Sequence, residues 1–365
     1  MRYRWFGLVA AVLVIVGLGG YLLLGVPAVQ DWLVARGTER EVARRPIDVD
    51  DRGSMRVLVC GTEPPPPSRR RAKSCTAVVA GGRVFIVDTG PGSANKLALW
   101  RFPINRISGV LFTHFHSDHI GDLGEFRMQS WATGRNAPLP VYGPDGVDKI
   151  VDGFNLAYAA DDAVRGTEHG LSVAAAQLVA HPFGLADPAS RATHMARRVI
   201  YDADGLRITA FQVVHEPVYP AVGYRFDYRG RSVVISGDTS VSANLVAVSR
   251  GADVLVHEAN SDAGRIAMVN ALRKAGQTHL AEVIGQIGNY HATPVQVARE
   301  ANAAGVKLLV YNHMGPIPPD NIVTRRFFAR GIAEIRPRAD WMLADDGLML
   351  TLPVGSKEIA TTMVE

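Results

Sequence analysis

The sequence has little cysteine and little net charge. Two of its 365 residues are cysteines, so it can form at most one disulfide within the chain. A formal net charge of +4 is small, and nothing in the charge pattern demands a nucleic-acid partner. The one dense basic run, residues 69–73, is typical of a solvated loop. No internal repeat or low-complexity tract is present, and an apolar content of 47% is ordinary for a chain that buries a sizeable core.

The two cysteines flank a predicted hairpin. Cys60 ends the apolar run MRVLVC and Cys75 opens CTAVVA, so the two can face each other across paired strands. In an oxidising compartment they would form a disulfide, whereas in a reducing one they would be two small buried hydrophobic residues. The sequence leaves both readings open.

The N-terminus lacks charge over 22 residues, from position 5 to position 26. At about 1.5 Å per residue such a helix spans a hydrocarbon core of roughly 30 Å. We therefore expect residues 1–26 to be a membrane anchor, with a cleaved signal peptide and a secreted product as the alternative, since Val26 and Ala28 suit a cleavage site. Basic residues on both sides leave the orientation open, but the short basic start favours an extracytoplasmic, periplasmic domain.

The rest of the chain divides into a linker, a large domain and a tail. Residues 27–50 form a charged linker, residues 51–352 the folded domain, and residues 353–365 a C-terminal tail. Short apolar runs predict strands at 55–60, 76–80, 83–87, 109–113, 139–142, 206–214, 222–228, 231–236, 253–256, 307–311 and 347–352. Helical patterns lie near 120–131, 145–160, 241–250, 263–275, 294–304 and 320–332. This order predicts two sheets with helices outside them, and residues 161–200 and 261–290 look inserted.

Residues 110–121 read VLFTHFHSDHIG and carry four candidate metal ligands directly after a run of strand-forming residues. Imidazole and carboxylate groups bind zinc and similar divalent ions at neutral pH. A polar surface loop does not account for this density of ligands, so the stretch predicts a metal site. The His-x-His spacing lets His114 and His116 bind one ion, while Asp118 and His119 turn toward a second position about 3.5–4 Å away, as in two-metal sites.

Each ion then needs further ligands, and the ends of later strands offer them. His215 closes ITAFQVVH, Asp238 closes RSVVISGD, and His313 follows KLLVYN. Residues that follow strands tend to carry chemistry on a rigid sheet. We therefore expect these three side chains to join the first cluster.

Together the motifs resemble those of the metallo-β-lactamase-fold hydrolases. VDTG at 87–90, HFHSDH at 114–119, His215, SGDT at 236–239 and YNH at 311–313 have the order and spacing of the ribonuclease Z and arylsulfatase-like branch. The resemblance runs from about residue 55 to residue 350. It implies an α/β fold, a four-layer αββα sandwich, with a binuclear zinc site at one edge.

The resemblance also implies the ligands of two Zn²⁺ ions. The first ion would bind three histidines: His114, His116 and His215. The second would bind Asp118, His119 and His313. Asp238 would bridge the two ions.

Further residues would support the ligands or take part in the reaction. Asp88 corresponds to the aspartate that holds the histidine loop by hydrogen bonds, and His257 and Glu258 belong to a further motif, VHEA, near the site. His291, in HATP, corresponds to a histidine placed to protonate the leaving group. The catalytic set implied is then His291, Asp118 and Asp238.

The reaction expected of such a site is zinc-dependent hydrolysis by a metal-bridging hydroxide. Metal binding lowers the pKa of water from 15.7 toward about 7, so a nucleophile exists at neutral pH. The expected substrate is a small-molecule ester, a phosphodiester or aryl sulfate. A lactonase or esterase is the alternative. A di-iron oxidoreductase is disfavoured because the chain has no room for a flavin domain.

One departure disfavours a tRNA 3'-processing endonuclease, and with it nucleic acid as a partner. Those members carry a long substrate-gripping arm between the positions of His215 and Asp238, whereas here only 22 residues separate the two. The membrane span also fits a cytoplasmic RNA enzyme poorly. A homo-oligomer remains open.

Overall fold

The computed structural model describes residues 6, 18, 20–185, 191 and 193–364. The chain divides into two compact units, residues 1–46 and 47–365. In the first unit, the predicted linker is helical over α2 (Pro27–Ala43), which starts with a proline at its first position and buries none of its residues. Most of the uncharged run at 5–26 lies outside the described residues. Among the residues that are described, no helix is long and apolar enough to cross a membrane.

The second unit contains two sheets. The first is eight-stranded, in the order β15-β14-β1-β2-β3-β4-β5-β6. Its strands are β1 (Ser54–Gly61), β2 (Cys75–Ala80), β3 (Arg83–Val87), β4 (Gly109–Leu111), β5 (Leu139–Gly143), β6 (Leu178–Pro182), β14 (Leu348–Pro353) and β15 (Ala360–Met363). The second is seven-stranded, in the order β13-β12-β11-β10-β9-β8-β7. Its strands are β7 (Arg197–Ala203), β8 (Leu206–Gln212), β9 (Val222–Tyr228), β10 (Arg231–Ile235), β11 (Val254–Asn260), β12 (Leu308–Gly315) and β13 (Trp341–Leu343).

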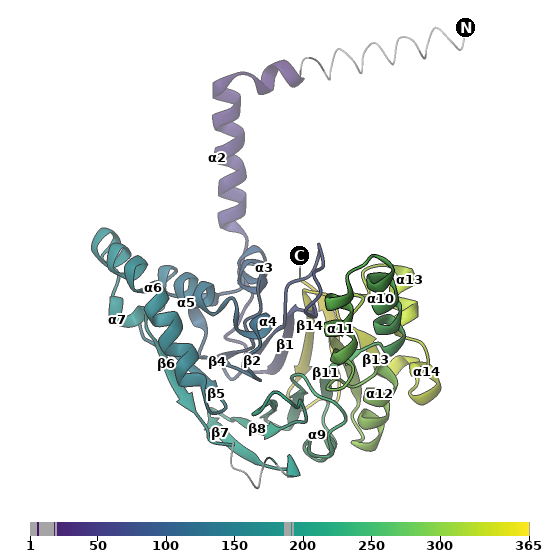
Figure 1. Cartoon of the computed structure of the whole chain (residues 1–365). Helices are drawn as coiled ribbons and strands as arrows, with labels where there is room; N and C mark the ends of the chain where they lie inside the picture. The colour runs from purple at the N-terminus through teal and green to yellow at the C-terminus, as the bar shows by residue number, and fades with distance from the viewer. Residues whose placement is uncertain (1–5, 7–17, 19, 186–190, 192, 365) are drawn as a thin grey trace. The chain divides into compact units, whose positions relative to one another are not determined.

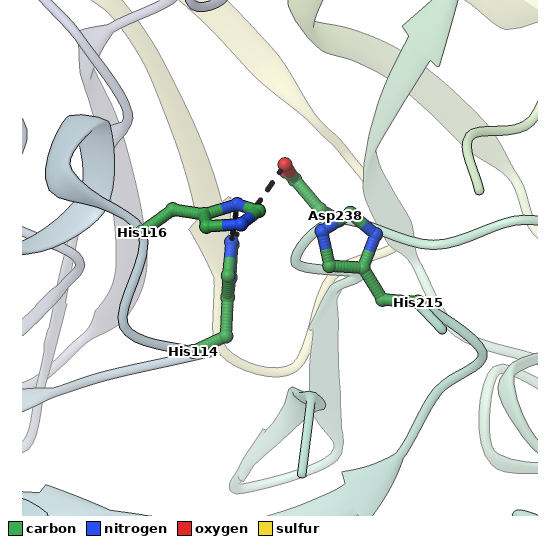
Figure 2. A group of neighbouring side chains, drawn as sticks. All are labelled: His114, His116, His215 and Asp238. Carbon is green, nitrogen blue, oxygen red and sulfur yellow. Dashed lines mark hydrogen bonds and ion pairs between the residues drawn. The ribbon is translucent and has the colours of Figure 1, made fainter. Parts of the chain in front are cut away.

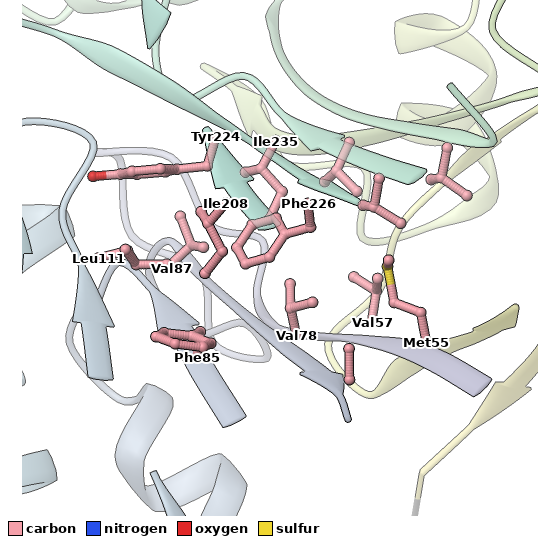
Figure 3. Close-up of a cluster of buried hydrophobic side chains, with 14 of the residues drawn as sticks. Met55, Val57, Val78, Phe85, Val87, Leu111, Ile208, Tyr224, Phe226 and Ile235 are labelled. Atoms are coloured by element: carbon pink, nitrogen blue, oxygen red, sulfur yellow. The ribbon is translucent and has the colours of Figure 1, made fainter. Parts of the chain in front are cut away.

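The two sheets pack face to face over an apolar core, drawn in Figure 3. Because side chains alternate along a strand, β1 sends Met55 and Val57 into this core and turns Leu58 and Cys60 to the opposite face. In β9, Tyr224 and Phe226 face inward in the same way. The strands that are buried on both faces are those that read as short, nearly continuous apolar runs in the sequence.

Helices cover the outer face of each sheet, which completes the predicted αββα sandwich (Figure 1). The first sheet packs against α3 (Ser93–Leu99), α5 (Leu123–Ala132) and α6 (Val147–His169). The second packs against α9 (Ala243–Val248), α12 (Pro294–Ala303), α13 (Ile322–Phe328) and α14 (Ile332–Ile335). The remaining helical segments are α4 (Ser117–Ile120), α7 (Val173–Ala176), α10 (Asp262–Lys274), α11 (Thr278–Ile287) and the 3₁₀ turns Ile104–Arg106 and Arg338–Asp340.

Two of the segments that the sequence set apart hold strands of the sheets, and a third, residues 261–290, forms a unit of its own. Residues 161–200 are not a simple insertion, because they hold the end of α6, helix α7, strand β6 and the start of β7, which are edge strands of the two sheets. Residues 261–290 form the helix pair α10 and α11 around a small apolar cluster of their own. The predicted tail contains β15, which pairs with β14.

Of the two readings of the cysteines, the structure has the disulfide. Cys60 in β1 and Cys75 in β2 are bonded, with their Cα atoms 5.0 Å apart, next to the point where the β1–β2 register shifts. The crosslink closes the loop that contains the four consecutive prolines at 64–67.

The topology gathers the polar motifs at one edge of the sandwich. Strands β3, β4 and β5 are parallel in one sheet, and β10, β11, β12 and β13 are parallel in the other. The carboxyl ends of parallel strands lie at the same edge of a sheet. The VDTG, HFHSDH and SGDT motifs lie at or just beyond the ends of β3, β4 and β10, and the VHEA and YNH motifs lie within β11 and β12, so the site is assembled at this edge.

Candidate metal centre

The histidine loop is held by Asp88, which follows β3. Its Oδ1 accepts a hydrogen bond from the Thr113 backbone N–H, and its Oδ2 accepts one from the Thr113 hydroxyl, both at 2.9 Å. The same Oδ2 lies 2.8 Å from His119 Nδ1. One buried carboxylate therefore fixes both the start of the loop and the far histidine.

Four side chains form a first group, drawn in Figure 2: His114, His116, His215 and Asp238. Each offers one ligand atom, and these atoms all lie within 4.8 Å of one another. His114 Nε2 lies 2.9 Å from His116 Nδ1 and 3.9 Å from Asp238 Oδ2. The His215 ring faces the group through Nε2, because its Nδ1 is hydrogen-bonded to the Tyr290 carbonyl at 3.1 Å.

A second group, also within 4.8 Å, consists of Asp118, His119 and His313. His313 Nε2 lies 3.2 Å from Asp118 Oδ2. Asp238 faces both groups, since its Oδ2 lies 3.4 Å from His119 Nε2 and its Oδ1 lies 3.8 Å from His313 Nδ1. The structure thus brings these seven side chains together as two neighbouring groups, with Asp238 between them.

The protonation of the first group suits metal binding. Burial lowers the pKa of His114 well below its ordinary value, and it lowers the pKa of His215 to about 4. Both rings are therefore neutral at physiological pH, which is the form that binds metals. In the described part of the chain, the buried Nε2 atoms of His119 and His215 have no hydrogen-bond partner. His215 Nε2 thus has no hydrogen-bond partner among the described residues, and His119 Nε2 faces the carboxylates of Asp238 and Asp118 at 3.4 and 3.9 Å, an arrangement that fits a bound cation.

The surroundings of His119 also favour a bound cation, although they shift its pKa in the opposite direction. Burial disfavours its charged form, but the nearby carboxylates of Asp238 and Asp88 outweigh burial and raise its pKa well above the ordinary value. Burial also opposes ionisation of Asp238, yet His313 and His119 hold its pKa well below the usual range. The negative field that retains a proton on His119 also attracts a metal cation, which competes with that proton.

His291 lies beside the two groups and is held by Glu258. Its ring centroid is 5.1 Å from that of His215 and 6.4 Å from that of His313. His291 Nδ1 lies 2.9 Å from Glu258 Oε1, which also accepts the Thr239 backbone N–H at 3.0 Å. Burial alone would lower the pKa of His291, but the Glu258 carboxylate raises it to about 9. This pKa favours the charged form of His291 at neutral pH, with Nδ1 engaged by Glu258.

His257 lies behind this pair. Its Nδ1 is 2.6 Å from the Glu258 carbonyl oxygen and its Nε2 is 3.6 Å from Glu300 Oε2. The sequence predicted His257 near the site, and the structure places it one layer further from the ligands than Glu258. Tyr290 and Glu300 were not predicted. Tyr290 directly precedes His291, which is the only signal for it, and Glu300 sits in α12 among residues that read as ordinary helix.

Comparison with known proteins agrees with this geometry. The family described as "Beta-lactamase superfamily domain" matches residues 83–314. Ribonuclease Z of Mycobacterium sp. (strain KMS) is 33% identical over 268 residues, which cover 73% of this chain and 86% of the relative. Ribonuclease Z of Mycobacterium avium (strain 104) is 34% identical over 266 residues, 72% of this chain and 86% of the relative.

Solved structures share the fold at lower identity. The metallo-β-lactamase fold protein YhfI from Bacillus subtilis has a TM-score of 0.58 at 19% identity, covering 82% of this chain and 99% of the other. The short form of human tRNase Z also has a TM-score of 0.58, at 21% identity and with the same coverage. A diphosphatase from the PhnP family has a TM-score of 0.55 at 18% identity, covering 82% and 98%. The chain therefore belongs to the β-lactamase superfamily, as a metallo-hydrolase of that fold with ribonuclease Z among its homologues.

Proposed function

We propose that the protein is a metal-dependent phosphodiesterase. The observation that carries the proposal is the position of Asp238 between two ligand groups, with a protonated histidine beside them. The ligand groups would hold two divalent ions, zinc in the first instance, which supply a water ionised near neutral pH and neutralise charge on the ester oxygens. This arrangement matches the needs of in-line displacement at a phosphodiester.

The chain's own residues would complete the reaction at the leaving group. His291 keeps its proton because Glu258 accepts its Nδ1–H, so Nε2 faces the site as a donor to the departing oxygen. Asp88 holds the loop that carries His114, His116 and His119 in place. Apart from the half-buried His116, these side chains are buried, which strengthens their electrostatic effect on charge that develops during the reaction.

The same site would also accept aryl sulfates, and a lactone or other carboxylic ester is the alternative. Because ribonuclease Z enzymes are among the relatives, RNA is also a candidate substrate. The sequence had led us to expect that nucleic acid is not a partner. Against tRNA 3'-processing stands the segment between His215 and Asp238. It is a loop followed by the hairpin of β9 and β10, with no room for the arm that the resemblance attributes to tRNA-processing members.

A substrate panel tests the proposal. The zinc-loaded protein would be assayed with bis-p-nitrophenyl phosphate, p-nitrophenyl sulfate, a lactone, a cephalosporin and a precursor tRNA. We expect turnover of the phosphodiester that His116→Ala abolishes. Turnover of the lactone or the cephalosporin alone would overturn the proposal, and accurate cleavage of the tRNA would replace it with the ribonuclease reading.

We also propose that the domain works outside the cytoplasm, tethered by the N-terminal apolar run or released by its cleavage. The Cys60–Cys75 disulfide supports this, because disulfides persist in oxidising compartments. Fractionation of cells that express the full chain, with protease added to intact spheroplasts, tests it. Protection of the domain from the protease would contradict an extracytoplasmic location.

A further inference from the structure

A small cavity of about 20 Å³ lies behind the metal centre, lined by residues of both sheets. Its polar lining includes Asp238, Asp88, Glu258 and Asn312. A volume of roughly 10–15 Å³ is enough for one water molecule, provided that polar partners surround it. The cavity is therefore the size of a single internal water.

Two buried oxygen atoms in the lining lack a donor. Within the described ranges, neither Glu258 Oε2 nor Asn312 Oδ1 has a hydrogen-bond partner. The two residues are only 3% and 6% exposed. They are direct register neighbours in the parallel strands β11 and β12, so their side chains leave the same face of the sheet side by side. With the Asn312 amide oriented as it is in the structure, both atoms accept hydrogen bonds and neither satisfies the other.

The hydroxyl of Ser236, which also lines the cavity, does not fill this need. The Ser236 hydroxyl donates to the Gly237 carbonyl at 2.6 Å and accepts the Glu258 backbone N–H at 3.2 Å. The Ser236 hydroxyl has one proton, and the bond to the Gly237 carbonyl already uses it. Leaving a buried acceptor unpaired is unfavourable, and more so when the group is charged, so a donor in the cavity is strongly favoured.

We propose that Glu258 and Asn312 bind one buried water, which donates a hydrogen bond to each, and that Asn312 thereby acts as a positioning residue for His291. The water fixes Glu258 Oε2, while Oε1 holds His291 Nδ1 at 2.9 Å and the Thr239 N–H at 3.0 Å. With both oxygens held, the carboxylate cannot rotate away from His291. Only the last step, proton donation by His291, rests on the proposed function.

A crystal structure at a resolution that shows ordered water tests the binding step without any assay. We expect density about 2.6–3.2 Å from both Glu258 Oε2 and Asn312 Oδ1. The same density should be missing from Asn312→Leu, which has a similar branched shape but no acceptor. An empty cavity in the wild-type protein would overturn the proposal, whatever the enzyme hydrolyses.

Kinetics with two leaving groups test the positioning step. Phenolate needs a proton more than p-nitrophenolate does, so a misplaced His291 should slow diphenyl phosphate more than bis-p-nitrophenyl phosphate. For Asn312→Leu we expect kcat to fall about 10- to 100-fold with the phenyl ester and by less than about threefold with the nitrophenyl ester, with KM and zinc content unchanged. Asn312→Ser, which has a hydroxyl and room for a second water, should recover most of the loss.

Asn244 provides the matched control. It is also buried and also has an Oδ1 without a partner in the described structure, but it does not line the cavity, and its amide nitrogen bonds the Ala196 and Gln212 carbonyls. Asn244→Leu should affect both esters equally. An equal loss on both esters in Asn312→Leu, or the same selective loss in Asn244→Leu, would refute the positioning role. A wild-type enzyme that cleaves neither ester would refute the phosphodiesterase proposal instead.

Discussion

Replacing Glu258 with Gln removes the negative charge of this side chain but keeps its shape, so it tests whether the charge sets the pKa of His291. Burial lowers the pKa of His291, and the Glu258 carboxylate outweighs burial and holds that pKa at about 9, above the ordinary 6.5. A raised pKa keeps the acid protonated at all lower pH values, and activity that needs the acid is lost above it. Gln removes the charge, so the pKa should fall to 6.5 or below. At pH 8 the protonated fraction then drops by about 30-fold, calculated from these two values.

The assay is kcat/KM for diphenyl phosphate measured between about pH 6 and pH 10. Bound cations lower the pKa of His291 in both proteins by like-charge repulsion, so the difference between the two profiles is the informative quantity. We expect the alkaline limb of Glu258→Gln to lie about two pH units or more below that of the wild type.

Glu300→Gln is the control for this experiment. Glu300 is a buried carboxylate that accepts the Ser242 N–H at 2.7 Å and faces His257 rather than His291. It should leave the alkaline limb in place. If Glu258→Gln lowers the rate uniformly and keeps the limb at the wild-type pH, the assignment of His291 as the acid is refuted.

Three further changes have defined outcomes. Asp238→Ala removes the carboxylate between the ligand groups, so elemental analysis should find fewer bound metals and most activity should be gone; full zinc content with full activity would contradict the shared ligand. Replacing Cys60 and Cys75 together with Ala removes a crosslink between residues 15 positions apart, which should lower the free energy of unfolding in urea by about 3 kcal/mol. An unchanged urea midpoint in oxidising buffer would show that the disulfide does not form. Asp162→Ala leaves the buried Arg127 guanidinium without its carboxylate partner, which should lower the free energy of unfolding by about 3–5 kcal/mol and reduce the Tm. A Tm close to that of the wild type would argue against the buried ion pair.

Much of the site could be predicted because its residues follow apolar strands. His114, His215 and Asp238 each come directly after such a run, and the structure brings them together from three strand ends. The predicted ends of β11 and β12 were too early, at residues 256 and 311, whereas the strands continue to Asn260 and Gly315. The polar site residues lie inside these strands, so the loss of apolar character did not mark a strand end.

The edges of both sheets were missed for a different reason. The edge strands are β15 and β6 in the first sheet and β13 and β7 in the second, and each pairs with one neighbour only. Strand β7 is also largely exposed along its length. An exposed strand has no buried face to impose alternation, so RRVIYDA has no clear pattern of period two. Helix α11 was not predicted as a helix of its own but as part of the inserted segment 261–290. It packs on α10 and not on the main core. Such elements depend on tertiary contacts that local sequence does not encode.

His215 and His291 show how the fold gives one residue type two roles. Their ring centroids are 5.1 Å apart, and both rings are buried. Burial lowers the pKa of each, but His215 Nδ1 faces the Tyr290 carbonyl and its pKa stays at about 4, whereas His291 Nδ1 faces the Glu258 carboxylate and its pKa rises to about 9. In the proposed reaction, the neutral ring would offer a lone pair to a metal, and the charged ring would offer a proton to the leaving group. The group behind each ring therefore sets its protonation. His215 follows β8, whereas His291 lies between α11 and α12, and neither position in the sequence shows which group will face Nδ1.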